Sequence, residues 1–147
     1  METLIEHDRV EPVQRQLKFE GLFTAKGNRR GGGLALFWHK ADIVQIFLSY
    51  LNFINVKVLI QSVESFIVTS FYGLPKFSRR RDSSNFLRSI ASQVAEPWCI
   101  LGDFNDMLQD SEKRGVHRQP RWCLQGFANA VEDYGLIDLG MEGYPFT

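Results

Sequence analysis

The segment from Pro97 to Asn105 contains the side chains whose types and spacing most clearly suggest chemistry. Its apolar run, Trp98–Leu101, predicts a short buried strand that ends in Gly-Asp-Phe-Asn. Asp103 and Asn105 then stand at the carboxyl end of a strand, where layered α/β proteins bind ligands. Side chains repeat with a period of two along a strand, so both are expected to point the same way. A carboxylate beside an amide could orient a water molecule next to a metal-bound phosphate. The alternative is structural: Asp103 or Asp106 caps a short helix that follows.

The segments on either side of this strand predict the framework that positions it. Alternating apolar residues indicate strands, and apolar residues three or four apart indicate amphipathic helices. We expect strands at Phe19–Thr24, Leu34–Trp38, Ile54–Ile60 and Ser65–Tyr72, helices near Pro12 and at Asp82–Val94 and Arg121–Tyr134, and a hairpin over Leu136–Thr147. Helices packed on a largely antiparallel or mixed sheet give an α/β fold class of the α+β type.

Composition limits the class of protein. The 147 residues are 44% hydrophobic and include twelve Phe, which is enough for a packed core. The formal net charge is zero and the pI is near 6.8, so only a local patch could attract nucleic acid. Cys99 and Cys123 lack metal-ligand spacing, which indicates neither a zinc site nor a disulfide-linked partner.

The sequence predicts an intracellular, soluble protein without a membrane partner. Acidic residues follow Met1, which is the wrong charge for the start of a signal peptide. The apolar segment Ile43–Ile60 is interrupted by polar residues too often for a membrane span, so it is interpreted as strands.

Two motifs and one histidine have competing interpretations. Gly31–Gly33 suggests a phosphate-binding loop, but no Gly-Lys-Ser/Thr follows, so flexibility at a strand entrance is preferred. Arg79–Arg81 could contact DNA phosphates, or could be the solvated start of a helix, where cations oppose the helix dipole. His117 lies in a charged loop and is expected to be solvated, not catalytic.

Several motifs, in their order along the chain, resemble the endonuclease/exonuclease/phosphatase superfamily. The likeness is greatest to the endonuclease domain of plant LINE-type (non-LTR) retrotransposons, and it covers essentially the whole chain. The motifs are Met1–Thr3, Gly31–Trp38, Ser70–Gly73, Pro97-Trp98, Gly102–Asn105, Glu112-Lys113, Gly135–Gly140 and Gly143–Thr147.

The resemblance implies a DNase I-like four-layer α/β sandwich that hydrolyses phosphodiesters with Mg²⁺, for which Mn²⁺ could substitute. By position, Glu2 is similar to the metal-ligating glutamate of the family, and Tyr72 to the tyrosine that contacts the scissile phosphate. Asp103 is similar to the aspartate that orients or deprotonates the attacking water, and Asn105 to its positioning partner. The implied partner is DNA and the implied compartment is the nucleus. The alternatives are a surface acid for Glu2 and a core or rim aromatic for Tyr72.

Residues 1–147 also depart from the family pattern. The first strand, with its metal-site Asn, would precede Glu2, and a closing Ser-Asp-His would follow Thr147. Leu4 stands where relatives usually have a basic residue. We therefore expect a single incomplete domain, weak or inactive, whose ancestral reaction is DNA nicking. Two alternatives stay open: a phosphatase or phosphodiesterase acting on a phosphoinositide or other small phosphoester, and a non-catalytic remnant or binding module.

Overall fold

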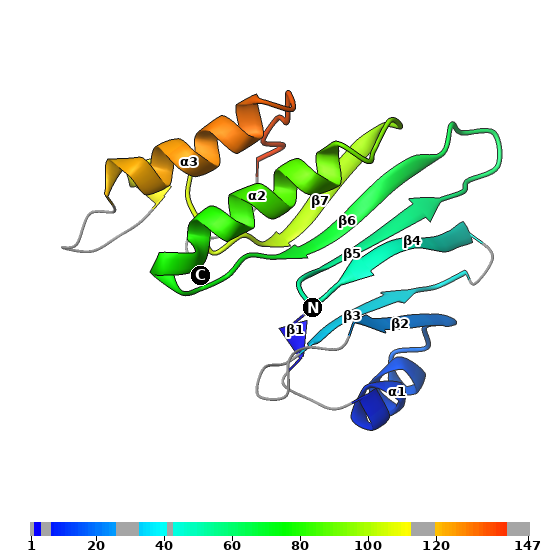
Figure 1. Ribbon diagram of the computed structural model, residues 1–147. Helices are drawn as coiled ribbons and strands as arrows, with labels where there is room; N and C mark the ends of the chain where they lie inside the picture. Colours follow the sequence, from blue (N-terminus) through cyan, green and yellow to red (C-terminus); the bar gives the residue numbers. More distant parts are fainter. Residues whose placement is uncertain (1, 4–6, 26–32, 41–42, 113–119, 141–147) are drawn as a thin grey trace. The chain divides into compact units, whose positions relative to one another are not determined.

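The computed structural model describes residues 2–3, 7–25, 33–40, 43–112 and 120–140. They form a mixed α/β structure with two sheets and three α-helices (Figure 1). The chain divides into two compact units. The first comprises Met1–Tyr72 with Val94–Asp103, and the second comprises Gly73–Gln93 with Phe104–Thr147. The predicted α/β, α+β-like class is confirmed at this level.

The first unit contains both sheets and one helix, α1 (His7–Gln16). One sheet is antiparallel and has the order β1-β3-β2; its strands are Glu2–Thr3, Gly33–Trp38 and Gly21–Ala25, respectively. The other has the order β4-β5-β6-β7, with strands Val44–Tyr50, Phe53–Val58, Phe66–Tyr72 and Trp98–Asp103. Only its β6–β7 pair is parallel. The prediction of a largely antiparallel or mixed sheet is therefore confirmed.

The core of the first unit lies between the two sheets. Ala25 and Leu34 of one sheet pack with Ile54 and Val56 of the other, and all four are buried. Ile54 and Val56 are two residues apart, so they lie on the same face of β5. Tyr72, at the end of β6, is half-buried and packs against this cluster.

The opposite face of the second sheet carries a chain of side-chain hydrogen bonds. Trp98 Nε1 donates to Thr69 Oγ1 at 2.8 Å, and Thr69 Oγ1 donates to Asn55 Oδ1 at 2.8 Å. Asn55 and Thr69 are fully buried. Buried polar groups are costly unless they are hydrogen-bonded, so this chain ties β5, β6 and β7 together.

The second unit is built on α2 (Arg80–Ala91) and α3 (Arg121–Glu132), which run side by side (Figure 1). An ion pair joins Arg88 Nε to Asp133 Oδ2 at 3.2 Å. The described part of this unit also contains two short 3-10 helices, Phe77–Arg79 and Asp110–Glu112. Both predicted helices are confirmed, although α2 begins two residues earlier and ends three residues earlier than predicted.

The prediction of a hairpin over Leu136–Thr147 is wrong for its described residues, 136–140. Residues 136–140 contain no strand, and Ile137 and Leu139 are exposed. Apolar residues favour a strand only where a neighbouring strand accepts their hydrogen bonds, and Leu136 N–H instead donates to Val131 O at the end of α3. Residues 141–147 lie outside the described part, as do the predicted loop 26–30, Gly31, Gly32 and His117.

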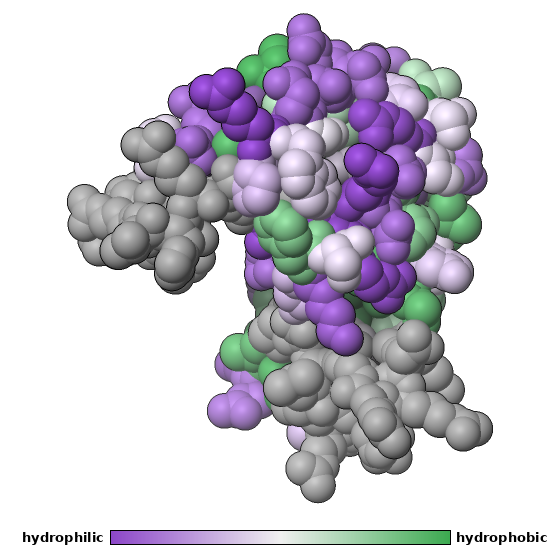
Figure 2. All heavy atoms as spheres, turned by 60° about the vertical axis from the view of Figure 1, so that its left-hand side comes forward, coloured by the Kyte–Doolittle hydropathy of each residue, from purple (hydrophilic) through white to green (hydrophobic). Residues whose placement is uncertain are grey.

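On the face of the molecule in Figure 2, hydrophobic residues appear as separate green areas among hydrophilic ones. Isolated exposed apolar residues of this kind are normal for proteins.

Within the described ranges, no helix is long and apolar enough to cross a membrane. Cys99 is a free thiol.

Candidate functional site

Tyr72 and Asp103 are direct neighbours at the carboxyl ends of β6 and β7. They are the last register pair between these two parallel strands, and parallel neighbours lie about 4.8 Å apart. Residues paired in register lie on the same face of a sheet, which here is the face that Tyr72 presents to the core between the sheets. Asp103 is exposed, whereas Tyr72 is half-buried. Two of the predicted site residues are therefore adjacent, at the kind of strand end where ligands bind.

Glycine permits the close approach of the two chain segments at this strand end. Gly102 has φ +143°, and a Cβ there would lie 1.9 Å from Phe71 O. A Cβ on Gly73 would lie 1.7 Å from Phe104 O. Any larger residue would push the backbone apart, so both glycines are needed for this geometry.

Asn105 is positioned differently from the prediction. β7 ends at Asp103, and Asn105 has φ +51°, the left-handed region. The period of two that would align Asn105 with Asp103 therefore does not apply, because it holds only along an extended strand. The Asn105 side chain instead donates from Nδ2 to Gly73 O at 2.9 Å. This bond fixes the residue that follows Tyr72 in the chain.

Asn52 is a positioning residue that the sequence alone does not reveal. It lies in the turn between β4 and β5, and it is buried. Its carbonyl accepts the N–H of Tyr72 at 2.8 Å, and its Nδ2 donates to Tyr72 O at 3.3 Å. Asn52 thus holds both backbone polar groups of Tyr72. In the sequence it appears only as one of several polar residues in an apolar segment.

Glu2, the predicted metal ligand, belongs to β1, the edge strand beside β3. Its register partner is Leu34, a member of the core cluster against which Tyr72 packs. The side chain of Glu2 lies outside the described part of the structure.

The described side chains offer hard oxygen donors for a cation but no complete ligand cage. Among them there is no group of three or more His, Cys, Asp or Glu that could hold a metal ion. Mg²⁺ commonly binds through one or two carboxylates and keeps several waters. A single carboxylate, as predicted for Glu2, is therefore enough to provide the protein's share of such a site.

Asp106 has a structural role, but not the predicted helix cap. Its carboxylate is 2% exposed and lies 3.6 Å from Arg80 Nη1, and it accepts the N–H of Met107 at 3.1 Å. Burial raises the pKa of Asp106, although the Met107 hydrogen bond and the Arg80 charge lower it in part. The capping role belongs to Glu112, which accepts the N–H groups of Leu108 and Gln109 just before its own 3-10 helix.

In comparisons with known proteins, no protein-family model and no curated protein matches the sequence.

Proposed function

We propose that the chain is an endonuclease/exonuclease/phosphatase domain of the DNase I-like, LINE-retrotransposon type, and that its reaction is metal-dependent nicking of DNA. The observation that carries the proposal is the pairing of Tyr72 with Asp103 at the carboxyl ends of adjacent parallel strands. These residues are thirty-one positions apart in the sequence, and the family resemblance selects both of them. Phe71 and Tyr72 of the first motif pair in register with Gly102 and Asp103 of the second.

The side chains suit the hydrolysis of a phosphodiester, in which water adds across one P–O bond to give a phosphomonoester and an alcohol. A carboxylate oxygen of Asp103 accepts a proton from the attacking water, which is the role of a general base. The Tyr72 hydroxyl donates a hydrogen bond to the charge that develops on phosphate oxygen. A bound Mg²⁺, or Mn²⁺ in its place, would neutralise the phosphate and stabilise the leaving oxygen.

The other two predicted residues support this pair. Glu2 is the proposed carboxylate ligand of the cation, on the edge strand that pairs with β3. Asn105 and Asn52 hold the backbone on the carboxyl side of Tyr72 and at Tyr72 itself, through Gly73 O and the two polar groups of Tyr72. A fixed backbone matters because displacement of a reacting group by about 1 Å can cost about 10²-fold in rate.

The test is nicking of supercoiled plasmid by the purified protein in Mg²⁺, after circular dichroism has shown that it is folded. Asp103→Ala should lower the rate by about 10²–10⁴-fold, as expected for loss of a general base. Tyr72→Phe should lower it by about 10²–10³-fold, as expected for loss of one oxyanion donor. The matched control is Asp110→Ala, which removes an exposed carboxylate from the 3-10 helix Asp110–Glu112 and should leave nicking unchanged.

Two outcomes would replace the proposal. A folded wild-type chain that does not nick DNA in Mg²⁺ or Mn²⁺ would favour a non-catalytic remnant or binding module. Hydrolysis of a soluble phosphomonoester or phosphoinositide headgroup without plasmid nicking, lost in Asp103→Ala, would keep the site but change the substrate to a small phosphoester.

A further inference from the structure

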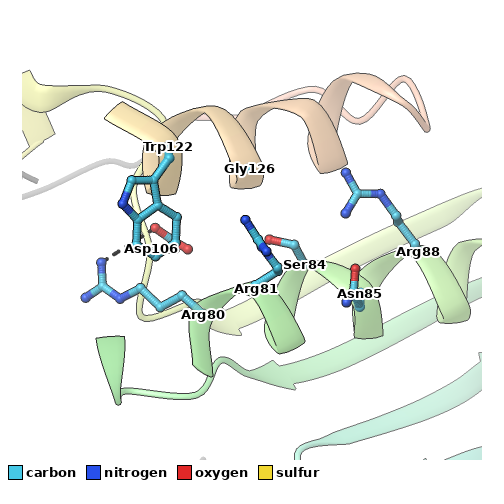
Figure 3. Close-up of a pocket in the computed structure, with 8 residues that line it drawn as sticks. All are labelled: Arg80, Arg81, Ser84, Asn85, Arg88, Asp106, Trp122 and Gly126. Atoms are coloured by element: carbon cyan, nitrogen blue, oxygen red, sulfur yellow. Dashed lines mark ion pairs between the residues drawn. The ribbon is translucent and has the colours of Figure 1, made fainter. Parts of the chain in front are cut away.

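A groove lies between α2 and α3, wholly within the second unit (Figure 3). It encloses about 230 Å³. Helix α2 provides one wall with Arg81, Ser84, Asn85 and Arg88, and α3 provides the other with Trp122 and Gly126. These four α2 side chains are all hydrogen-bond donors, and two of them are cations. Arg80 and Asp106 also line the groove, as an ion pair. Such a lining suits an anionic ligand.

The charges at the start of α2 are placed against the helix dipole. Arg80 and Arg81 are its first two residues, where cations are usually destabilising because the helix N-terminus is itself positive. Arg80 is matched by the buried Asp106 carboxylate, and Arg88 by the exposed Asp133. Three arginines and the two carboxylates paired with them leave one net positive charge at the groove, in a chain whose net charge is zero.

An aromatic surface borders the same groove. Trp122 is 50% exposed and Phe77 is 42% exposed, and their rings meet edge to face with centroids 5.3 Å apart. The guanidinium carbon of Arg81 lies 5.9 Å from the centroid of Trp122. An exposed indole beside a guanidinium is a surface on which a nucleobase can stack.

Gly126 keeps the groove open. It lies in the interior of α3, and a Cβ added there would meet no atom within 4 Å. Glycine inside a helix costs about 1 kcal/mol relative to alanine, and no neighbouring atom in α3 or around it requires its small size. The helix bears this cost at the position where a side chain would enter the groove.

We propose that this groove binds a segment of single-stranded nucleic acid, with a phosphate held by Arg81, Arg88 and the polar side chains of α2 and an unpaired base stacked on Trp122. At about 230 Å³ the groove is smaller than the roughly 300–1,000 Å³ that encloses a whole small-molecule ligand. It is therefore suited to one portion of a longer chain that lies across it. A duplex hides its base faces by stacking, so the exposed indole favours an unpaired strand.

The test is fluorescence anisotropy with a labelled single-stranded oligodeoxynucleotide, in EDTA so that no metal-dependent reaction contributes. Arg81→Gln should weaken binding and should reduce the slope of log K against log salt by about 0.7, the contribution of one phosphate contact to a single strand. Its matched control is Arg15→Gln, which removes an exposed cation from α1 and should leave the slope unchanged. Trp122→Ala should weaken binding by about tenfold, as expected for loss of one stacked base.

A second variant blocks the groove without removing any charge. Gly126→Leu has room for its Cβ and suits a helix better than glycine, so we expect the melting temperature to be kept or raised while the oligonucleotide is bound at least about tenfold more weakly. The proposal is overturned if Arg81→Gln and Arg15→Gln weaken binding equally, if Gly126→Leu binds as the wild type does, or if a duplex or a polyglutamate peptide binds as tightly as the single strand. Since binding is measured in EDTA, failure here leaves the proposed nicking activity untouched.

Discussion

At the scale of single residues, Asp106 shows how burial and charge compete at one carboxyl group. Its side chain is 2% exposed and lies 3.6 Å from Arg80 Nη1. Loss of hydration raises the pKa of Asp106, and the Met107 N–H and the Arg80 charge do not fully offset it. The ion pair is therefore weak evidence of stabilisation, because desolvation of a buried pair can exceed its Coulomb attraction.

The raised pKa of Asp106 makes stability depend on pH in a defined direction. Above its ordinary value of 3.8, the folded state still binds a proton that the unfolded state has released. The contribution of Asp106 to the free energy of unfolding is therefore fully present below its ordinary pKa. This contribution is lost as the pH rises through the higher pKa of the folded state. We expect the stability of the wild type relative to Asp106→Asn to fall with rising pH and then level off.

This prediction is checked by urea unfolding of both proteins across the acidic to neutral range. Asp110→Asn removes one exposed carboxylate and corrects for the change in net charge. The prediction would be contradicted if the free energy of unfolding of the wild type, minus that of Asp106→Asn, increased with pH.

The sequence motifs single out Tyr72 and Asp103, which the structure pairs in register, but they do not single out Asn52. Tyr72 and Asp103 belong to motifs with distinctive composition, and the structure places them side by side. Asn52 holds Tyr72 through one main-chain and one side-chain bond, yet nothing in its neighbourhood distinguishes it from other turn asparagines. Its role depends on a contact twenty positions away, which a single sequence does not encode in any local pattern.

At the scale of elements, the strands with alternating apolar residues and the two long helices were predictable because their patterns reflect a buried face. Element ends were less predictable. β7 extends through Gly102 to Asp103 because Gly102, at φ +143°, allows close pairing with Phe71. Leu136–Gly140 has strand-like composition but does not form a strand, since strand formation requires a partner that local composition does not define.

The hydrogen-bonded chain across the second sheet gives a prediction at this scale. Thr69→Val keeps the shape and the β-branching of the side chain but removes the hydroxyl that joins Trp98 Nε1 to Asn55 Oδ1. Each buried group that loses its partner costs about 1–3 kcal/mol. We therefore expect the free energy of unfolding to fall by at least about 2 kcal/mol, which unfolding in urea followed by circular dichroism would measure.

The control for that substitution is Thr24→Val in β2. It makes the same chemical change in a half-buried residue of the other sheet, and it should change stability by less than about 0.5 kcal/mol. If both variants lost the same free energy of unfolding, the loss in Thr69→Val would come from removing any strand hydroxyl. It would then not come from breaking the hydrogen bonds that join Trp98, Thr69 and Asn55.

At the scale of the whole molecule, the zero net charge and an exposed edge strand both favour self-association. The formal net charge is zero and the pI is near 6.8, so molecules at neutral pH have little mutual repulsion. β4 is an edge strand, and its register shifts between Ile46 and Leu48, at Phe47. A bulge makes an edge less suitable for pairing with another chain, but Phe47 itself is 52% exposed.

Self-association should therefore be greatest near pH 6.8 and should decline on either side as net charge of either sign accumulates. Phe47→Lys should reduce self-association more than the same charge would at a site outside the edge strand, because a charged edge strand resists pairing with another chain. Val63→Lys is the matched control: it adds the same charge at a residue that is 57% exposed, outside any strand. Light scattering on a size-exclusion column across the pH series measures the mass of the associated species. If the two variants reduce that mass equally, net charge controls association and the β4 edge does not; if only Phe47→Lys reduces it at pH 6.8, the exposed edge strand is the surface through which the molecules meet.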